Sequence, residues 1–218
     1  MKPNVVLLHG LLRTGRSMDR LARTIEREGY RVWVRSYPSQ VLSIEASAAE
    51  IASELERRFG KQPVALVTHS LGGIVARYIA GPFGDALDIE RILMLAPPNR
   101  GSRLARRLGA FRAFQRLYGP AGQQLRAADE HAWPTPNVPV AVIAGTRAGG
   151  LNPTGWLSRA TRLIHHSEPS DGTVLVEETH FPGMVDFATV NASHTFIMNH
   201  PRVHQMALAF LRDGKLQP

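Results

Sequence analysis

The feature that most constrains this chain is an apolar run over residues 63–68 that ends just before a serine, Ser70. Two glycines, Gly72 and Gly73, follow the serine, and a helical pattern then continues to Ala80. This order predicts a strand, a sharp turn and a helix, with a hydroxyl group at the apex of the turn. A serine there becomes reactive when a base lies within hydrogen-bond reach, so Ser70 is a candidate nucleophile. The alternative is a serine that only caps the helix.

Length and composition exclude several classes of protein. The 218 residues suffice for one domain with a sizeable core, so we expect a single domain over residues 1–218. The chain has no cysteine, which excludes disulfides and thiolate chemistry. Its nine histidines are scattered without the spacing of metal ligands, so we expect neither a metal nor another cofactor.

The net charge of +8 comes mostly from arginine. Because the arginines are scattered and no nucleic-acid-binding motif accompanies them, we interpret them as a solvated surface and expect no specific nucleic-acid partner. Weak contact with an anionic lipid surface is the alternative. No apolar run is long enough to cross a membrane, and the run over residues 5–8 is too short for a signal peptide, so a cytoplasmic location is expected.

Strand-like and helix-like segments alternate along the chain. Strands are expected near residues 5–9, 31–36, 64–68, 89–95, 139–144 and 185–191, and helices near 17–28, 44–59, 71–80 and 201–211. This alternation predicts an α/β fold with a mostly parallel sheet of about six strands and helices on both faces. The carboxyl ends of the strands then share one edge, where Gly10, Ser70, Asp171 and His194 would meet.

The base that serves Ser70 is expected near the end of the chain. His194 lies between the last strand and the last helix, in a loop that could reach over the serine turn. His200 is the second choice, although its place at the start of a helix already explains it. His165 and His166 are expected on a surface loop, and His194 itself could be an ordinary loop histidine.

A carboxylate must orient the base and stabilise its charged form. Asp171, in a turn-rich loop, is the first candidate, and Asp186 and Glu168 remain as alternatives. The order serine, aspartate, histidine along the chain is that of the nucleophile-elbow hydrolases. The charge that develops on an attacked carbonyl oxygen needs N–H donors, which Leu71 and Leu11 could supply as an oxyanion hole.

Five segments together resemble one family. They are Leu8-His9-Gly10-Leu11, Thr68-His69-Ser70-Leu71-Gly72-Gly73, Leu95-Ala96-Pro97-Pro98-Asn99-Arg100-Gly101-Ser102, Ser170-Asp171-Gly172-Thr173-Val174 and Ser193-His194-Thr195. They resemble the α/β-hydrolases over nearly the whole chain, and more narrowly the small bacterial lipases and esterases. The resemblance implies the α/β-hydrolase fold, in a minimal six-stranded version, with Ser70 as nucleophile, His194 as base, Asp171 as orienting acid, and Leu11 and Leu71 as oxyanion donors. Thr68 departs from the family, because it stands where the first glycine of G-x-S-x-G belongs.

The family often places a cap or lid in the connection that spans about residues 99–137 here. Apolar residues in this stretch follow one helical face, and five arginines lie largely elsewhere. We therefore expect a further helix packed on the sheet, with a cap over the site, facing lipid or an anionic substrate, as the alternative.

The sequence thus predicts a serine hydrolase that cleaves small carboxylic esters with an apolar acyl group through an acyl-enzyme. Leu12, Arg13 and His69 are the further residues expected to contact substrate. A thioesterase, amidase or acyltransferase would use the same residues, and a non-catalytic binding protein with this fold is the remaining alternative. Neither the natural substrate nor the oligomeric state follows from the sequence.

Overall fold

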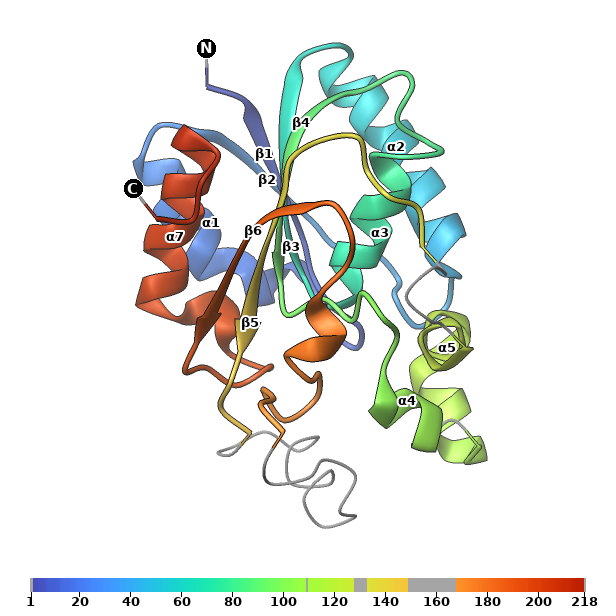
Figure 1. Ribbon diagram of the computed structural model, residues 1–218. Coiled ribbons are helices and arrows are strands. Elements are labelled where there is room, and N and C mark those ends of the chain that lie inside the picture. The colour runs from blue at the N-terminus through green and yellow to red at the C-terminus, as the bar shows by residue number, and fades with distance from the viewer. Residues whose placement is uncertain (1, 109, 128–132, 149–167, 218) are drawn as a thin grey trace.

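A computed structural model describes residues 2–108, 110–127, 133–148 and 168–217. Six parallel strands form one sheet in the order β2-β1-β3-β4-β5-β6 (Figure 1). The strands are β1 (Asn4–Leu8), β2 (Arg31–Arg35), β3 (Pro63–His69), β4 (Asp88–Leu95), β5 (Val140–Gly145) and β6 (Met184–Val190). The α-helices are α1 (Asp19–Arg27), α2 (Ile44–Phe59), α3 (Leu71–Ile79), α4 (Arg103–Leu108), α5 (Arg112–Ala127) and α7 (Pro201–Asp213). Short 3₁₀ turns are η1 (Gly15–Met18), η2 (Glu177–Thr179) and η3 (Ile197–Asn199).

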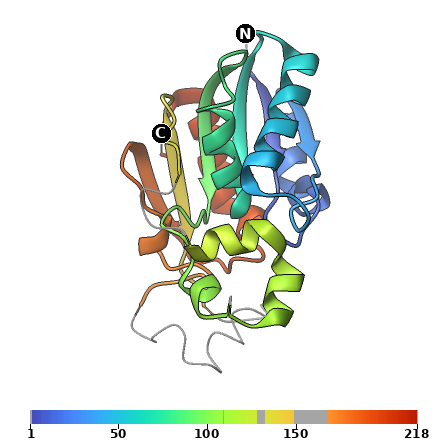
Figure 2. The ribbon, with the colours of Figure 1, turned by 90° about the vertical axis from the view of Figure 1, so that its right-hand side faces the viewer.

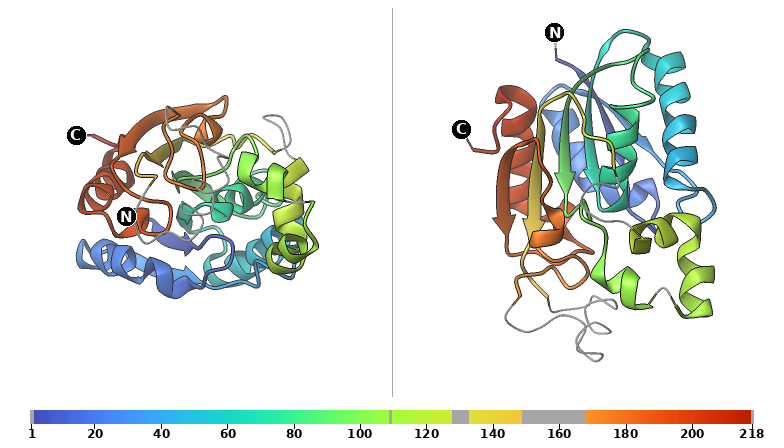
Figure 3. Two further views of the ribbon diagram at one scale, coloured as in Figure 1. Left: turned by 90° about the horizontal axis from the view of Figure 1, so that it is seen from below. Right: turned by 45° about the vertical axis from the view of Figure 1, so that its right-hand side comes forward.

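The sheet divides the interior into two cores, one on each face. Successive residues of β1 alternate between them: Val6 and Leu8 pack in the core under α2 and α3, whereas Val5 and Leu7 pack in the core under α1 and α7. Alternation of this kind follows from the two-residue period of a strand. Because both faces are covered, the central strands are apolar throughout, as is typical of parallel sheets. The predicted α/β class, with helices on both faces of a six-stranded parallel sheet, is therefore confirmed (Figure 3).

The chain order creates a natural site at one edge of the sheet. The chain passes from β1 outward to β2 and then returns to β3 on the other side of β1, so the direction of winding reverses between β1 and β3. Ligands of open parallel sheets bind outside the carboxyl ends of the strands at such a reversal. Leu8 at the end of β1 pairs with Thr68 near the end of β3, which brings the segments after the two strands together.

The segment after β4 differs from the expected helix on the sheet. It forms two helices, α4 and α5, which lie beyond the carboxyl end of the sheet on the side of α2 and α3 (Figure 2). The non-helical Gly119, followed by Pro120, kinks α5, so this stretch cannot form one straight helix along a sheet face. A Cβ atom on Gly119 would lie 1.8 Å from the carbonyl oxygen of Gln40, which requires glycine there. The expectation of a helix packed on the sheet is therefore wrong.

Hydrogen bonds hold these two helices at the edge. The Gln124 side chain accepts from the Ile44 N–H at 2.8 Å and donates to Glu45 at 2.6 Å, which ties α5 to the first turn of α2. Glu178, which is buried, accepts from the backbone N–H groups of Arg103 and Leu175 and so fixes the start of α4 beside η2. The cap formed by α4 and α5 is thereby anchored at both ends.

Candidate active site

Ser70 lies at the turn between β3 and α3, as the sequence predicts. Its backbone has φ 52° and ψ −122°, a conformation that residues other than glycine rarely adopt. The Ser70 N–H donates to the Leu95 carbonyl at 2.9 Å, and the Ser70 carbonyl accepts from the Gly73 N–H at 2.9 Å. A Cβ atom on Gly72 would lie 2.8 Å from the carbonyl oxygens of Leu8 and His9, so glycine lets α3 start close against β1. These contacts hold the strained turn.

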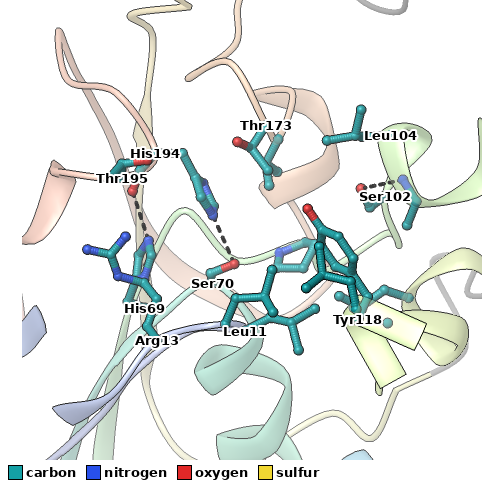
Figure 4. A pocket seen from close by; sticks show the side chains of 17 residues that line it. Leu11, Arg13, His69, Ser70, Ser102, Leu104, Tyr118, Thr173, His194 and Thr195 are labelled. Atoms are coloured by element: carbon teal, nitrogen blue, oxygen red, sulfur yellow. Dashed lines mark hydrogen bonds between the residues drawn. The ribbon is translucent and has the colours of Figure 1, made fainter. Parts of the chain in front are cut away.

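Three side chains form one hydrogen-bonded chain at this turn. His194 Nε2 lies 3.0 Å from Ser70 Oγ, and His194 Nδ1 lies 2.7 Å from Asp171 Oδ2 (Figure 4 draws the first contact). Because Nδ1–H donates to the carboxylate, Nε2 is left to accept the Ser70 hydroxyl proton. The structure therefore brings together the three residues that the sequence singled out for these positions.

The Asp171 loop is itself tightly held. Asp171 is 1% exposed, and its Oδ1 accepts from the N–H groups of Thr173 at 2.9 Å and Val174 at 2.8 Å. Its backbone carbonyl accepts from the His194 N–H at 3.0 Å, which joins the two loops directly. A Cβ atom on Gly145 would lie 2.7 Å from Asp171 Cβ, so glycine at the end of β5 makes room for this loop.

The alternative residues have other partners. Asp186, within β6, accepts from the N–H groups of Phe187 and Leu216, and Glu168 pairs with Arg103 at 2.8 Å. His200 accepts from the Arg202 N–H and so caps α7, as expected from its place at a helix start. His165 and His166 lie outside the described residues.

Thr68 fits the turn without disturbing it. Its side chain is fully buried, and its hydroxyl donates to the Leu93 carbonyl at 3.2 Å. A Cβ atom on Gly73 would lie 3.4 Å from the Thr68 hydroxyl oxygen and 3.0 Å from Pro97 Cβ. The glycine on the helix side therefore leaves space for the threonine on the strand side.

The loop after β1 passes directly over the serine. A Cβ atom on Gly10 would lie 2.9 Å from Ser70 Cβ, so Leu11 follows at a point where the backbone runs against the turn. Leu12, the next residue, has a positive φ of 61° and lines the cavity at Ser70. Leu71 opens α3, and the first N–H groups of a helix have no partner within it. Both expected oxyanion donors thus lie on segments next to Ser70.

Two buried histidines support this part of the site. His9 stacks on Tyr37 with ring centroids 4.4 Å apart, donates from Nδ1 to the Gly10 carbonyl and accepts the Tyr37 N–H at Nε2. His69 donates from Nε2 to the His194 carbonyl at 3.0 Å, and its ring lies 4.8 Å from that of His194. Burial lowers the pKa of His9, and burial with the nearby His194 lowers the pKa of His69 well below its usual value. Both rings are therefore neutral at pH 7.

A cavity of about 460 Å³ opens beside Ser70, which is one of the residues that line it (Figure 4). Leu11, Leu12, Arg13 and His69, all expected at the substrate, line it. Sequence reasoning missed most of the remaining wall, which comes from the cap and the Asp171 loop: Ser102, Leu104, Ala105, Leu117, Tyr118, Gly122, Leu125, Thr173 and Val174. Its size and largely apolar wall are typical of a small-molecule site.

The described ranges contain neither a metal-binding cluster nor a membrane-spanning helix. No group of three or more histidine, aspartate or glutamate side chains is placed there to hold a metal ion. None of the helices in those ranges combines the length and apolar composition that a membrane crossing requires.

Comparison with known proteins identifies the family and the fold. The profile of the alpha/beta hydrolase family matches residues 5–208. The mature lipase BlEst2 of Bacillus licheniformis superposes with a TM-score of 0.72 at 19% identity, covering 96% of this chain and 92% of that one. The phospholipase PlaB of Legionella pneumophila gives 0.73 at 19% identity, with 100% and 59% covered.

A metagenomic carboxyl esterase gives a TM-score of 0.66 at 21% identity, covering 88% of this chain and 64% of that one. This chain therefore spans less than two thirds of the phospholipase and of the esterase. No protein with a curated description matches the sequence significantly. At identities this low, the likeness to solved structures concerns the fold.

Proposed function

Because the chain belongs to the alpha/beta hydrolase family, we propose that it is a serine hydrolase that cleaves carboxylic esters. The observation that carries the proposal is the hydrogen-bonded chain from Ser70 through His194 to Asp171 at the wall of a cavity. Solved structures described as a lipase, a phospholipase and a carboxyl esterase share the fold and so favour ester chemistry.

The proposed reaction proceeds through an acyl-enzyme. Ser70 Oγ attacks the ester carbonyl while His194 Nε2 takes its proton, and Asp171 stabilises the imidazolium that forms. The N–H groups of Leu11 and Leu71 bind the oxyanion of the tetrahedral intermediate. His194 then gives the proton to the departing alcohol, and water activated by the same imidazole releases the acid.

The wall of the cavity supports an apolar acyl group. Leu104, Ala105 and Leu125 from the cap are buried and line the cavity, and Tyr118 completes this side. Burial of an apolar chain against these residues releases water and stabilises binding. We infer that the acyl chain of the ester lies on the cap side of Ser70.

A fluorophosphonate probe tests the nucleophile. We expect the probe to label the wild-type protein and not Ser70→Ala. This difference would identify the Ser70 hydroxyl as the group that reacts with the probe. A series of p-nitrophenyl esters of increasing acyl length, with Ser70→Ala as control, then gives the preferred chain length. A folded wild-type protein that neither reacts with the probe nor hydrolyses any ester of the series would overturn the proposal and favour a non-catalytic binding protein.

A further inference from the structure

The cavity has two chemically different ends. Figure 4 shows Leu104 and Tyr118 on one side of Ser70, and Arg13 beside His69 on the other. The first end is apolar. The second end carries a guanidinium group, contributed by the loop that follows β1.

Among the described residues, none forms a hydrogen bond or ion pair with the Arg13 side chain. Its side chain is partly buried, its Nε is fully buried without a hydrogen-bond acceptor, and within the described ranges the guanidinium forms no ion pair. Two other partly buried arginines are paired with carboxylates: Arg35 contacts Glu54 at 2.6 Å, and Arg103 contacts Glu168 at 2.8 Å. A guanidinium removed from water without an acceptor is costly, because its N–H groups lose hydration and gain nothing in return. An acceptor that arrives with a ligand would remove that cost.

Among the described residues, no acidic side chain pairs with Arg13 to compensate its positive charge. His69 is fully buried and already donates its one N–H to the His194 carbonyl, so it contributes no charge. His9, the other nearby ring, is buried and neutral as well. Arginine itself stays protonated at neutral pH even when burial lowers its pKa. The cavity end beside His69 therefore holds a fixed cation.

We propose that Arg13 is an anion-binding residue of the site, which takes a carboxylate or phosphate group on the alcohol part of the ester. This inference rests on the proposed ester hydrolysis. The alcohol leaves with the proton of His194 Nε2, and the His194 backbone is hydrogen-bonded to His69, next to Arg13. The acyl part lies at the opposite, apolar end. The substrate class is thus an ester with an apolar acyl chain and an anionic alcohol.

The anionic group takes no part in the bond changes. The bond from Ser70 Oγ to the acyl carbon forms, the bond from that carbon to the alcohol oxygen breaks, and the alcohol departs with the proton that His194 took from Ser70. Arg13 binds the anion through charge-assisted hydrogen bonds in the ground state and the transition state alike. Its removal should therefore act mainly through KM.

Butyrate esters that differ only in the alcohol test the proposal. In the first set the alcohol is a hydroxyalkanoic acid of two to four carbons, so the ester has a free carboxylate. In the second set the carboxylate is replaced by the matching neutral amide. In the third the alcohol is 2-hydroxyethyl phosphate. Titration of the released acid gives kcat/KM without a chromogenic group. We expect the wild-type protein to favour an anionic ester over its amide by about tenfold at low salt, with the preference falling as ionic strength rises. The third set shows whether phosphate or carboxylate fits better.

Substitutions distinguish the effect of Arg13 on the substrate preference from the effect of the protein's overall positive charge. Arg13→Gln should bring the ratio of anionic to amide ester close to one, and Arg13→Lys should keep part of the preference. Arg16→Gln removes an exposed arginine from the adjoining turn η1 and should leave the ratio unchanged. If Arg13→Gln does not fold, the ratio of anionic to amide ester hydrolysis in the wild-type protein, and its dependence on salt, still test the proposal.

The two proposals fail in different ways. A protein that hydrolyses the amide ester as fast as the anionic esters at low salt is an esterase without this anion site, and only the role of Arg13 is overturned. An unchanged ratio in Arg13→Gln has the same meaning. Absence of hydrolysis of every ester, together with no fluorophosphonate labelling, overturns the proposed function instead.

Discussion

The reactive geometry proposed for Ser70 depends on glycine residues that lie next to it. Its positive φ is a conformation that costs roughly 1–3 kcal/mol for a residue other than glycine. Gly10 and Gly72 let two backbones approach the turn closely, and hydrogen bonds at the Ser70 N–H and carbonyl hold it from both sides. The surrounding structure thus supports a local conformation that the sequence of the turn alone would not favour.

The two aspartates considered from the sequence give a matched test at this scale. Asp171→Asn should lower kcat by about a thousandfold or more, because an amide that donates to Nδ1 would hold the His194 imidazole in the wrong tautomer. Asp186→Asn should leave kcat within a fewfold of wild type, because the Asp186 carboxylate accepts from the backbone N–H groups of Phe187 and Leu216 and does not contact His194. Steady-state kinetics with a p-nitrophenyl ester measures both. Equal losses would contradict the role proposed for Asp171.

The sequence was sufficient for the residues that follow strands. Ser70 and His194 are predicted to lie close together because each comes shortly after a predicted strand, and parallel strands bring such positions to one edge. The contact of His69 with the His194 carbonyl was not predicted, because it depends on how the His194 loop folds back over the turn. The wall formed by Tyr118 and Leu125 was missed for a similar reason, since the pattern gave a helix but not its place.

At the scale of elements, the start of α3 against β1 depends on one glycine. A Cβ atom on Gly72 would meet two backbone oxygens at 2.8 Å, and backbone cannot move aside as a side chain can. Gly72→Ala should therefore lower the free energy of unfolding by about 1–3 kcal/mol and also lower kcat, because α3 and Ser70 must shift.

Gly73 provides the control in the same helix. A Cβ atom there would meet only side-chain atoms of Pro97, Met94 and Thr68 at 3.0–3.4 Å, so Gly73→Ala should cost less. Denaturant unfolding and ester hydrolysis measured on both variants decide the point. A larger loss in Gly73→Ala than in Gly72→Ala would show that the approach of α3 to β1 is not the limiting contact.

The position of the cap could not be predicted from the hydrophobic pattern of the sequence. An amphipathic pattern identifies an apolar face but not the surface that covers it. In α4 the buried Leu104 and Ala105 line the cavity, so their apolar face is part of the wall of the site. The kink at Gly119 depends on the approach of Gln40, a contact between residues far apart in the sequence. Long-range contacts of this kind are what the sequence alone did not reveal.

At the scale of the whole molecule, buried neutral histidines predict sensitivity to acid. Burial is the main cause that lowers the pKa values of His9, His69 and His204. Since unfolding restores their ordinary pKa near 6.5, the unfolded chain binds more protons below that pH, and stability falls as pH drops through this range. Protonation of His9 would also remove the acceptor for the Tyr37 N–H.

Thermal unfolding measured between pH 7.5 and 5.0 checks this expectation. We expect the Tm to fall by several degrees over that interval, and His204→Gln to show a smaller fall, because one of the three groups no longer titrates. Glu178 acts in the opposite direction. Burial raises its pKa, so the folded state binds a proton at Glu178 more readily than the unfolded chain, and through this group stability rises as pH falls. A Tm that stays level or rises on acidification would mean that the three histidines do not dominate.

The segment that contains the cap is rich in arginine, and two of its arginines, Arg103 and Arg106, pair with Glu168 and Glu178. Residues 99–127 contain seven arginines and no acidic residue, against a net charge of +8 for the whole chain. Arg107, Arg112 and Arg116 are exposed, and the apolar Phe111 and Leu117 beside them are 62% and 52% exposed. A basic surface with exposed apolar side chains at a cavity is suited to an anionic lipid surface, where each arginine contributes about 1 kcal/mol.

Vesicle sedimentation tests contact with an anionic lipid surface, which so far stays a prediction. The protein should bind vesicles that contain phosphatidylglycerol and not vesicles of phosphatidylcholine, and salt should release it, because the attraction is electrostatic. Changing Arg107, Arg112 and Arg116 together to Glu should abolish binding. The same changes at Arg20, Arg23 and Arg27, exposed on α1, alter the net charge equally and should leave most of the binding intact. Equal losses in the two triple variants would show that net charge, and not the cap, attracts the protein to lipid.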